Sequence, residues 1–239
     1  MSDWWSFRIL CPPDQLRAGH VRRLVADLVG LGYLAPGDGA SVWCMSADGS
    51  GAVAFDSLDA AASWLDAGEG LLPLRRADLD LDLSVHRADG ILATEMHHLP
   101  DDPIFHVVAL TLAKSVFPKV SWAAIEEALF TSLRALPFSF AYGISDATAE
   151  SVADYECVHR RVAAGRLPPF LPWISAVPEQ HRALSAAIDQ AASLVGRSVA
   201  RCDGLRLLTL SDTPLDGPEH AVLQASSRWR EATHDGGCA

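Results

Sequence analysis

The sequence is poor in basic residues relative to acidic ones. Its 19 Lys and Arg residues stand against 30 Asp and Glu residues, which gives a formal net charge of −11 at pH 7. Affinity for phosphate backbones and for anionic lipid surfaces rests on clustered Lys and Arg, so this balance argues against a nucleic-acid-binding protein and against membrane-surface binding. It suits a partner protein that is basic.

Other signals are also absent. No window approaches the roughly 18 uninterrupted apolar residues that a membrane span needs. Residues 1–5 lack the basic and apolar stretches of a signal peptide, so the expected location is the cytoplasm. The five cysteines form no CxxC pair and no zinc-finger spacing, which predicts buried or incidental thiols in a reducing compartment. No P-loop and no GxGxxG motif is present, and we expect no cofactor.

What is present is a sizeable apolar fraction. With 239 residues, 49% of them hydrophobic, the chain can bury a real core. Its period-2 and period-3.6 patterns predict a single α+β domain over 1–232, with mostly antiparallel strands and helices packed on one side, followed by a flexible tail over 233–239. Strands are expected at 6–10, 42–45, 52–55, 79–85, 91–98, 138–142 and 205–210, and helices at 14–31, 58–67, 121–136, 146–164, 179–195 and 218–229. The run 104–112, apolar on both faces, fits a central strand or a buried helix.

The clearest strand is 79–85, in which leucine or valine alternates with aspartate or serine. Asp80 and Asp82 are expected on its polar face, and in one plausible register Glu95 joins them from the strand at 91–98. These three carboxylates form either a solvated acidic face or a docking surface for a basic protein partner. With His86 and His97, and with His98 or His106 as a further ligand, they could instead hold a divalent metal.

A serine between an expected strand and an expected helix suggests an alternative. Residues 143–147 (Gly-Ile-Ser-Asp-Ala) have the small flanking residues and the context of a hydrolase nucleophile elbow, with Ser145 as the nucleophile. Asp203 or Asp212, followed by His220, could complete a small serine hydrolase. The simpler interpretation is that Ser145 or Asp146 caps the following helix.

One tryptophan lies in an unusual setting. Trp173 follows the proline-rich stretch 167–172 (Leu-Pro-Pro-Phe-Leu-Pro), which stiffens the backbone and denies it a regular element. A rigid segment that presents tryptophan suits a binding hot spot, and covering the core is the alternative.

The second half resembles bacterial immunity proteins of polymorphic toxin systems, and immunity protein 52 in particular. The resemblance covers about 138–218. It rests on the segment 140–143 (Phe-Ala-Tyr-Gly), an amphipathic helix, the run 165–174 around the prolines, and the segments 203–210 and 211–214. It implies a non-catalytic cytoplasmic protein that neutralises a cognate toxin by binding it.

Overall fold

The computed structural model describes residues 4–35, 41–46, 51–68, 70–88, 104–113, 121–145, 155–169 and 172–210. The chain divides into two compact units, residues 1–137 and 138–239, and each is described by itself. The paired strands described within each unit are all antiparallel, which confirms the predicted α+β class. The predicted strand 91–98, the predicted helix 218–229 and the predicted tail 233–239 lie outside the described residues.

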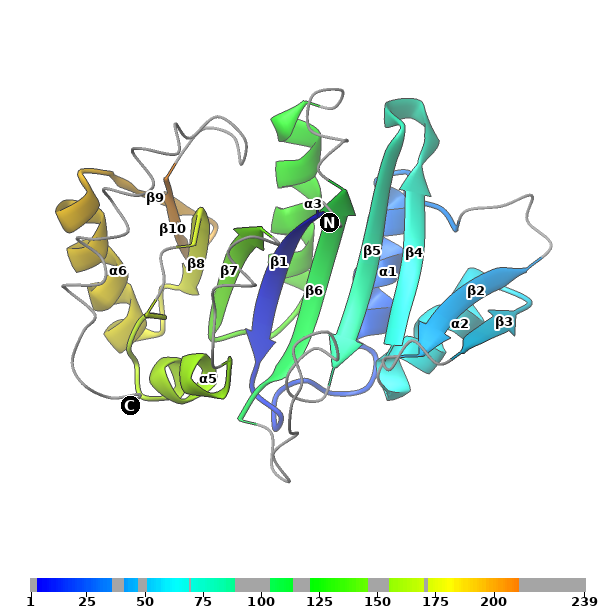
Figure 1. The fold of residues 1–239 in the computed structure, drawn as a ribbon, viewed down its shortest axis with the longest axis horizontal. Helices are drawn as coiled ribbons and strands as arrows, with labels where there is room; N and C mark the ends of the chain where they lie inside the picture. The colour runs from blue at the N-terminus through cyan, green and yellow to red at the C-terminus, as the bar shows by residue number, and fades with distance from the viewer. Residues whose placement is uncertain are drawn as a thin grey trace. The chain divides into compact units, whose positions relative to one another are not determined.

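The first unit contains an antiparallel sheet with the strand order β3-β2-β4-β5-β6-β1 (Figure 1). The run 104–112 forms a strand, because β6 pairs along its length with β1 on one side and β5 on the other. The strand β4 was not predicted. The strands are β1 (Trp4–Cys11), β2 (Val42–Ser46), β3 (Ala52–Phe55), β4 (Gly70–Arg76), β5 (Leu81–Ala88) and β6 (His106–Ala113).

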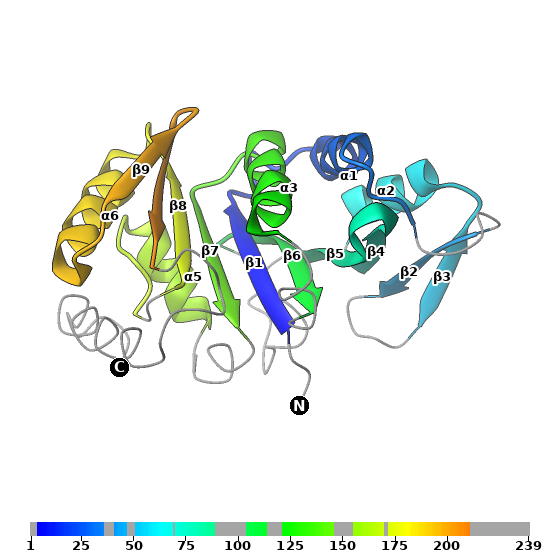
Figure 2. The same ribbon diagram turned by 90° about the horizontal axis from the view of Figure 1, so that it is seen from above.

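Three helices cover one face of this sheet, as Figure 2 shows: α1 (His20–Gly30), α2 (Leu58–Ala67) and α3 (Trp122–Ala135). Helix α1 packs against both α2 and α3, and α2 contacts β2, β3, β4 and β5. The core lies between the helices and the sheet. It includes Leu24 and Leu28 of α1, and Leu72 and Leu74 of β4, all at most 1% exposed.

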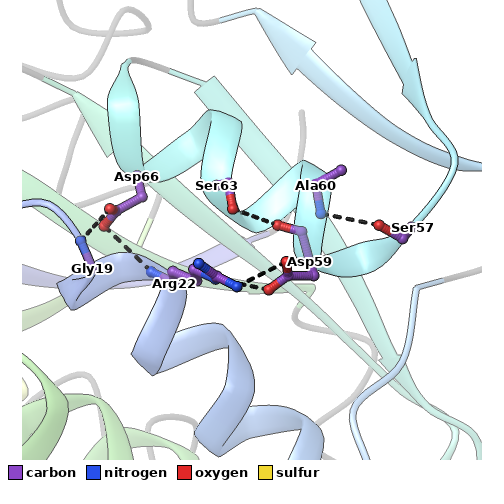
Figure 3. A network of polar contacts seen from close by, with 7 residues as sticks. All are labelled: Gly19, Arg22, Ser57, Asp59, Ala60, Ser63 and Asp66. Atoms are coloured by element: carbon purple, nitrogen blue, oxygen red, sulfur yellow. Dashed lines mark hydrogen bonds and ion pairs between the residues drawn. The ribbon is translucent and has the colours of Figure 1, made fainter.

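A carboxylate from α2 caps the N-terminus of α1. Gly19, the residue before α1, has a φ of 99° and no side chain to cap the helix. The side chain of Asp66 takes that role: it accepts a hydrogen bond from the backbone N–H of Gly19 (Figure 3) and another, at 2.8 Å, from the N–H of Val21. Arg22 also binds Asp59 of α2 through two hydrogen bonds of 2.7 and 2.9 Å. The sequence predicted that this helix begins at Asp14. In the structure α1 begins at His20.

The strand predicted at 79–85 begins two residues later. Ala77–Leu79 form a short 3-10 helix, and Asp80 follows it with a φ of 50° in the left-handed region. Strand β5 starts at Leu81, and its leucines and Val85 are buried as the alternation predicted. Asp80 therefore belongs to a turn and not to the strand.

The second unit contains β7 (Phe140–Ser145), β8 (Ile174–Pro178), β10 (Leu205–Thr209) and β9 (Val199–Cys202), paired in that order. Strands β8 and β9 were not predicted. Helix α6 (Arg182–Val195) packs on β8, β9 and β10, and α5 (Tyr155–Ala163) precedes β8 in the chain. Asp203 and Gly204, with φ of 51° and 76°, form the tight turn between β9 and β10.

Candidate partner-binding surface

The face of the first sheet that the helices leave uncovered is exposed over β2, β4 and β5. Along these strands buried residues alternate with exposed or half-buried ones. Because residues paired across antiparallel strands point to the same side, the pairs Met45–Leu71 and Arg75–Asp82 share this face. We call it the open face. It comprises Leu34, Trp43, Met45, Leu71, Pro73, Arg75, Asp82 and Ser84.

Large apolar side chains are exposed on the open face. Leu34 is 57% exposed, Trp43 53% and Met45 45%. Leu34 joins the face through a two-residue bridge to Arg75 of β4, and Trp43 lies opposite Ala54 of β3. Exposed aromatic and aliphatic side chains that share one face cost solvation free energy in an isolated chain, which makes this face the candidate interaction surface.

The alternation in the strand at 42–45 places Trp43 and Met45 on one side and Val42 and Cys44 on the other. In the structure Val42 and Cys44 are buried, and Trp43 and Met45 are exposed. The alternation alone does not say which of the two faces the helices cover, and our sequence interpretation selected Trp173 instead.

Two of the predicted acidic residues lie next to this apolar cluster and share a basic neighbour. The guanidinium of Arg75 donates to the carboxylate of Asp80 at 2.6 Å, and its Nε lies 3.8 Å from the carboxylate of Asp82. All three side chains are largely exposed. The local charge is therefore −1 rather than −2, so the edge of the open face is weakly acidic.

The third predicted carboxylate, Glu95, lies outside the described residues, as do His97 and His98. The strand predicted at 91–98 was expected beside β5. Both sides of β5 are occupied by β4 and β6, so β6 takes that place.

Trp173 is held against the backbone of the second unit. It is half-buried, its backbone N–H donates to the carbonyl of Gly143, and its own carbonyl accepts from the N–H of Leu210. A Cβ placed on Gly143 would lie 2.5 Å from Nε1 of the Trp173 indole. The ring therefore packs over Gly143, a position consistent with a packing role.

No metal site is visible within the described ranges, because no three His, Cys, Asp or Glu side chains gather there. His86 follows Asp82 and Ser84 on the same side of β5, and its Nε2 is buried with no described residue in hydrogen-bonding distance. Burial, and secondarily the charge of Arg8, lowers the pKa of His86 to about 4. The ring is therefore neutral at pH 7.

Most residues of the alternative serine hydrolase site lie outside the residues that the structure describes. Ser145 is the last residue of β7, and the segment that follows it, Asp212 and His220 lie outside the described residues. The indole of Trp173 leaves no room for a side chain at position 143. This packing accounts for Gly143 without a nucleophile elbow. Asp203, the other acid considered, forms the β9–β10 turn.

The cysteines differ from one another. Cys11, Cys44 and Cys202 carry free thiols, and burial raises the pKa of Cys11 to about 12 and that of Cys44 to about 11. Cys157 is disulfide-bonded, so the prediction of buried or incidental thiols in a reducing compartment is wrong for this residue.

Comparison with solved structures yields a distant likeness. No protein-family model and no curated protein matches the sequence. Among solved structures, the chain is similar to the Pseudomonas aeruginosa T6SS protein PA0821, with a TM-score of 0.48 and 10% identity, over 95% of this chain and 73% of that chain. A likeness this distant says nothing of function. In the described part of the chain, no helix has the length and apolar character to cross a bilayer.

Proposed function

We propose that this protein is a non-catalytic protein-binding module that inhibits a cognate bacterial toxin, in the manner of an immunity protein. Its basic partner binds the open face of the first unit. The observation that carries the proposal is the 53% exposure of Trp43 on a sheet face beside Asp80 and Asp82.

The residue types on the open face suit an interface. Tryptophan and methionine are enriched where proteins bind one another, and a few such anchors supply most of the affinity once they are desolvated. Carboxylates at the rim mainly accelerate the encounter with a basic partner. The net charge of −11 extends that attraction over the whole chain.

The sequence resemblance over about 138–218 supports the immunity class. Its segments include β7, the proline-rich approach to β8, and the Asp203–Gly204 turn that opens β10. Trp173, the anchor first predicted from that region, packs over Gly143. The proposal therefore places the main anchor at Trp43.

The test begins with the tagged full chain in lysate of the native host. Wild type and the variants Trp43→Ala and Leu194→Ala are compared, because Leu194 is 40% exposed on α6 and serves as the matched control. We expect one basic chain to be retained by wild type and Leu194→Ala and lost from Trp43→Ala. Expressed alone, that chain should arrest growth.

Co-expression then tests inhibition. Wild type should restore growth in the presence of the captured chain, and Trp43→Ala should not, while both accumulate to the same level. A captured chain that is harmless when expressed alone would rule out the immunity role. A toxic chain that Trp43→Ala binds and inhibits as well as wild type would remove the open face as the binding site.

A further inference from the structure

We propose that the free edge of β3 pairs with β3 of a second copy of this chain, which makes the protein a two-fold symmetric homodimer. Strand β3 is the last strand of the first sheet and pairs on one side with β2. Among the described residues nothing pairs with its other side. Ala52, Val53 and Ala54 are exposed, so this edge is accessible to another strand.

The edge of β3 is short, at four residues, but it carries no charge and no proline. Edge strands are normally blocked by lysine or other charges, by proline or by a bulge, because their unpaired N–H and C=O groups attract another strand. The sequence of β3 is Ala-Val-Ala-Phe, and it pairs with β2 in continuous register from Val42 to Met45. The edge strand of the second unit, β9, instead carries the exposed Arg201.

Charge favours a second copy at this edge. Two copies that each carry −11 repel one another over most of their surfaces. Strands β2 and β3 contain no charged residue, although charged residues make up 21% of the chain. Two copies can therefore approach edge to edge here without opposing like charges.

The geometry of a two-fold pairing is self-consistent. An antiparallel pair of identical strands is related by a two-fold axis, so each copy supplies the same groups and no open end remains to grow a fibre. The alanines at 52 and 54 share their side of the sheet with Met45 and Trp43. Pairing would therefore continue the open face across the axis, with small side chains at the seam.

This inference does not rest on the proposed function, and its test uses the purified chain alone. Val53 is 41% exposed and lies opposite Cys44, on the side of the sheet away from Trp43. Val53→Lys places two like charges at the seam and leaves the open face unchanged. Val53→Thr keeps an uncharged β-branched side chain, and Ala200→Lys puts the same charge on the exposed edge strand β9.

The mass in solution is measured by sedimentation over a wide range of concentration. Wild type, Val53→Thr and Ala200→Lys should approach twice the chain mass of 25.6 kDa. Val53→Lys should remain at 25.6 kDa, or show a dimer dissociation constant raised by at least about tenfold, with unchanged circular dichroism. In wild type, amide exchange at 52–55 should slow as the concentration rises.

Two results would overturn the proposal. One is a wild-type chain that stays at 25.6 kDa at every concentration. If, in addition, amides 52–55 become protected only when another protein is bound, the edge of β3 pairs with a strand of that protein. The other is a folded Val53→Lys chain that dimerises as tightly as wild type.

Discussion

The indole of Trp173 occupies the space that a side chain on Gly143 would need. A Cβ at Gly143 would lie 2.5 Å from Nε1 of that indole and 2.6 Å from Cγ2 of Ile174. Gly143 of β7 pairs with Ile174 of β8, so the contact lies where these two strands are paired. The tryptophan is thereby fixed to the sheet of its own unit.

Gly143→Ala should lower the free energy of unfolding by about 1–3 kcal/mol, because the added methyl group overpacks the site. Urea unfolding measures the change. In the background Trp173→Ala the same substitution should cost less, since the indole is gone. Gly68→Ala is the matched control: no atom lies within 4 Å of its Cβ position and its φ is not positive. Equal stability of Gly143→Ala and wild type would contradict this packing.

Substituting Trp43 and substituting Trp173 should have different effects on the free energy of unfolding. Trp43→Ala removes an exposed side chain and should change the free energy of unfolding by no more than about 0.5 kcal/mol. Trp173→Ala removes a packed ring and should cost about 2 kcal/mol or more. If Trp43→Ala destabilises the chain as much as Trp173→Ala, Trp43 serves the fold rather than a partner.

Asp66 should matter more to stability than its neighbour Asp59. Asp66→Ala leaves the N–H groups at the start of α1 without their acceptor and should cost about 1–2 kcal/mol. Asp59→Ala breaks a pair with Arg22 in which both side chains are more than half exposed, and should cost less than about 1 kcal/mol. Thermal or urea unfolding of both variants gives the comparison, and the reverse order would exclude the capping role.

The carboxylates beside Arg75 should control the rate of association with the captured partner. Asp80→Asn combined with Asp82→Asn leaves Arg75 without its two carboxylate neighbours and makes this edge basic. Association should slow and its salt dependence should flatten, while dissociation changes little.

The matched control for this pair removes two charges elsewhere in the first unit. Asp14→Asn with Asp27→Asn changes the net charge equally but leaves the open face intact. Stopped-flow association at several salt concentrations compares the two variants. If both slow association to the same extent, net charge rather than the open face steers the partner.

His86 should make the protein less stable below neutral pH. Its pKa in the folded chain is about 4, below the ordinary value of 6.5, so the unfolded chain takes up the proton first as the pH falls. The stability present above pH 6.5 is therefore lost progressively towards pH 4. His86→Gln should show a shallower loss in that interval in urea unfolding. A wild-type slope in His86→Gln would contradict a buried neutral ring.

Elements with a strong local pattern were predictable. The helix at 58–67 coincides with α2, whose N-cap Ser57 accepts from the N–H of Ala60 as its sequence suggests. The hairpin strands at 42–45 and 52–55 coincide with β2 and β3. In each case neighbouring residues carry the whole signal, namely a capping side chain or a period of two.

Strands that contain proline were missed for a physical reason. Proline cannot donate to a ladder, so it argues against a central strand. Pro73 nevertheless lies in β4, between the stretch that pairs with β2 at Gly70 and Leu71 and the bridge from Arg75 to Leu34. Pro178 ends β8. Only the arrangement of the neighbouring strands shows that strand pairing tolerates the missing N–H of proline at these positions.

By itself the sequence determined the α+β class, the acidic charge and the side chains that share a strand face, because these follow from composition and from the period of the backbone. Only the tertiary structure decided which faces are covered. It placed Trp43 in solvent and Trp173 over Gly143, and it turned Asp80 out of the strand to share Arg75 with Asp82. These outcomes depend on contacts between residues far apart in the chain, such as the helices that cover one side of the sheet, and no local pattern encodes them.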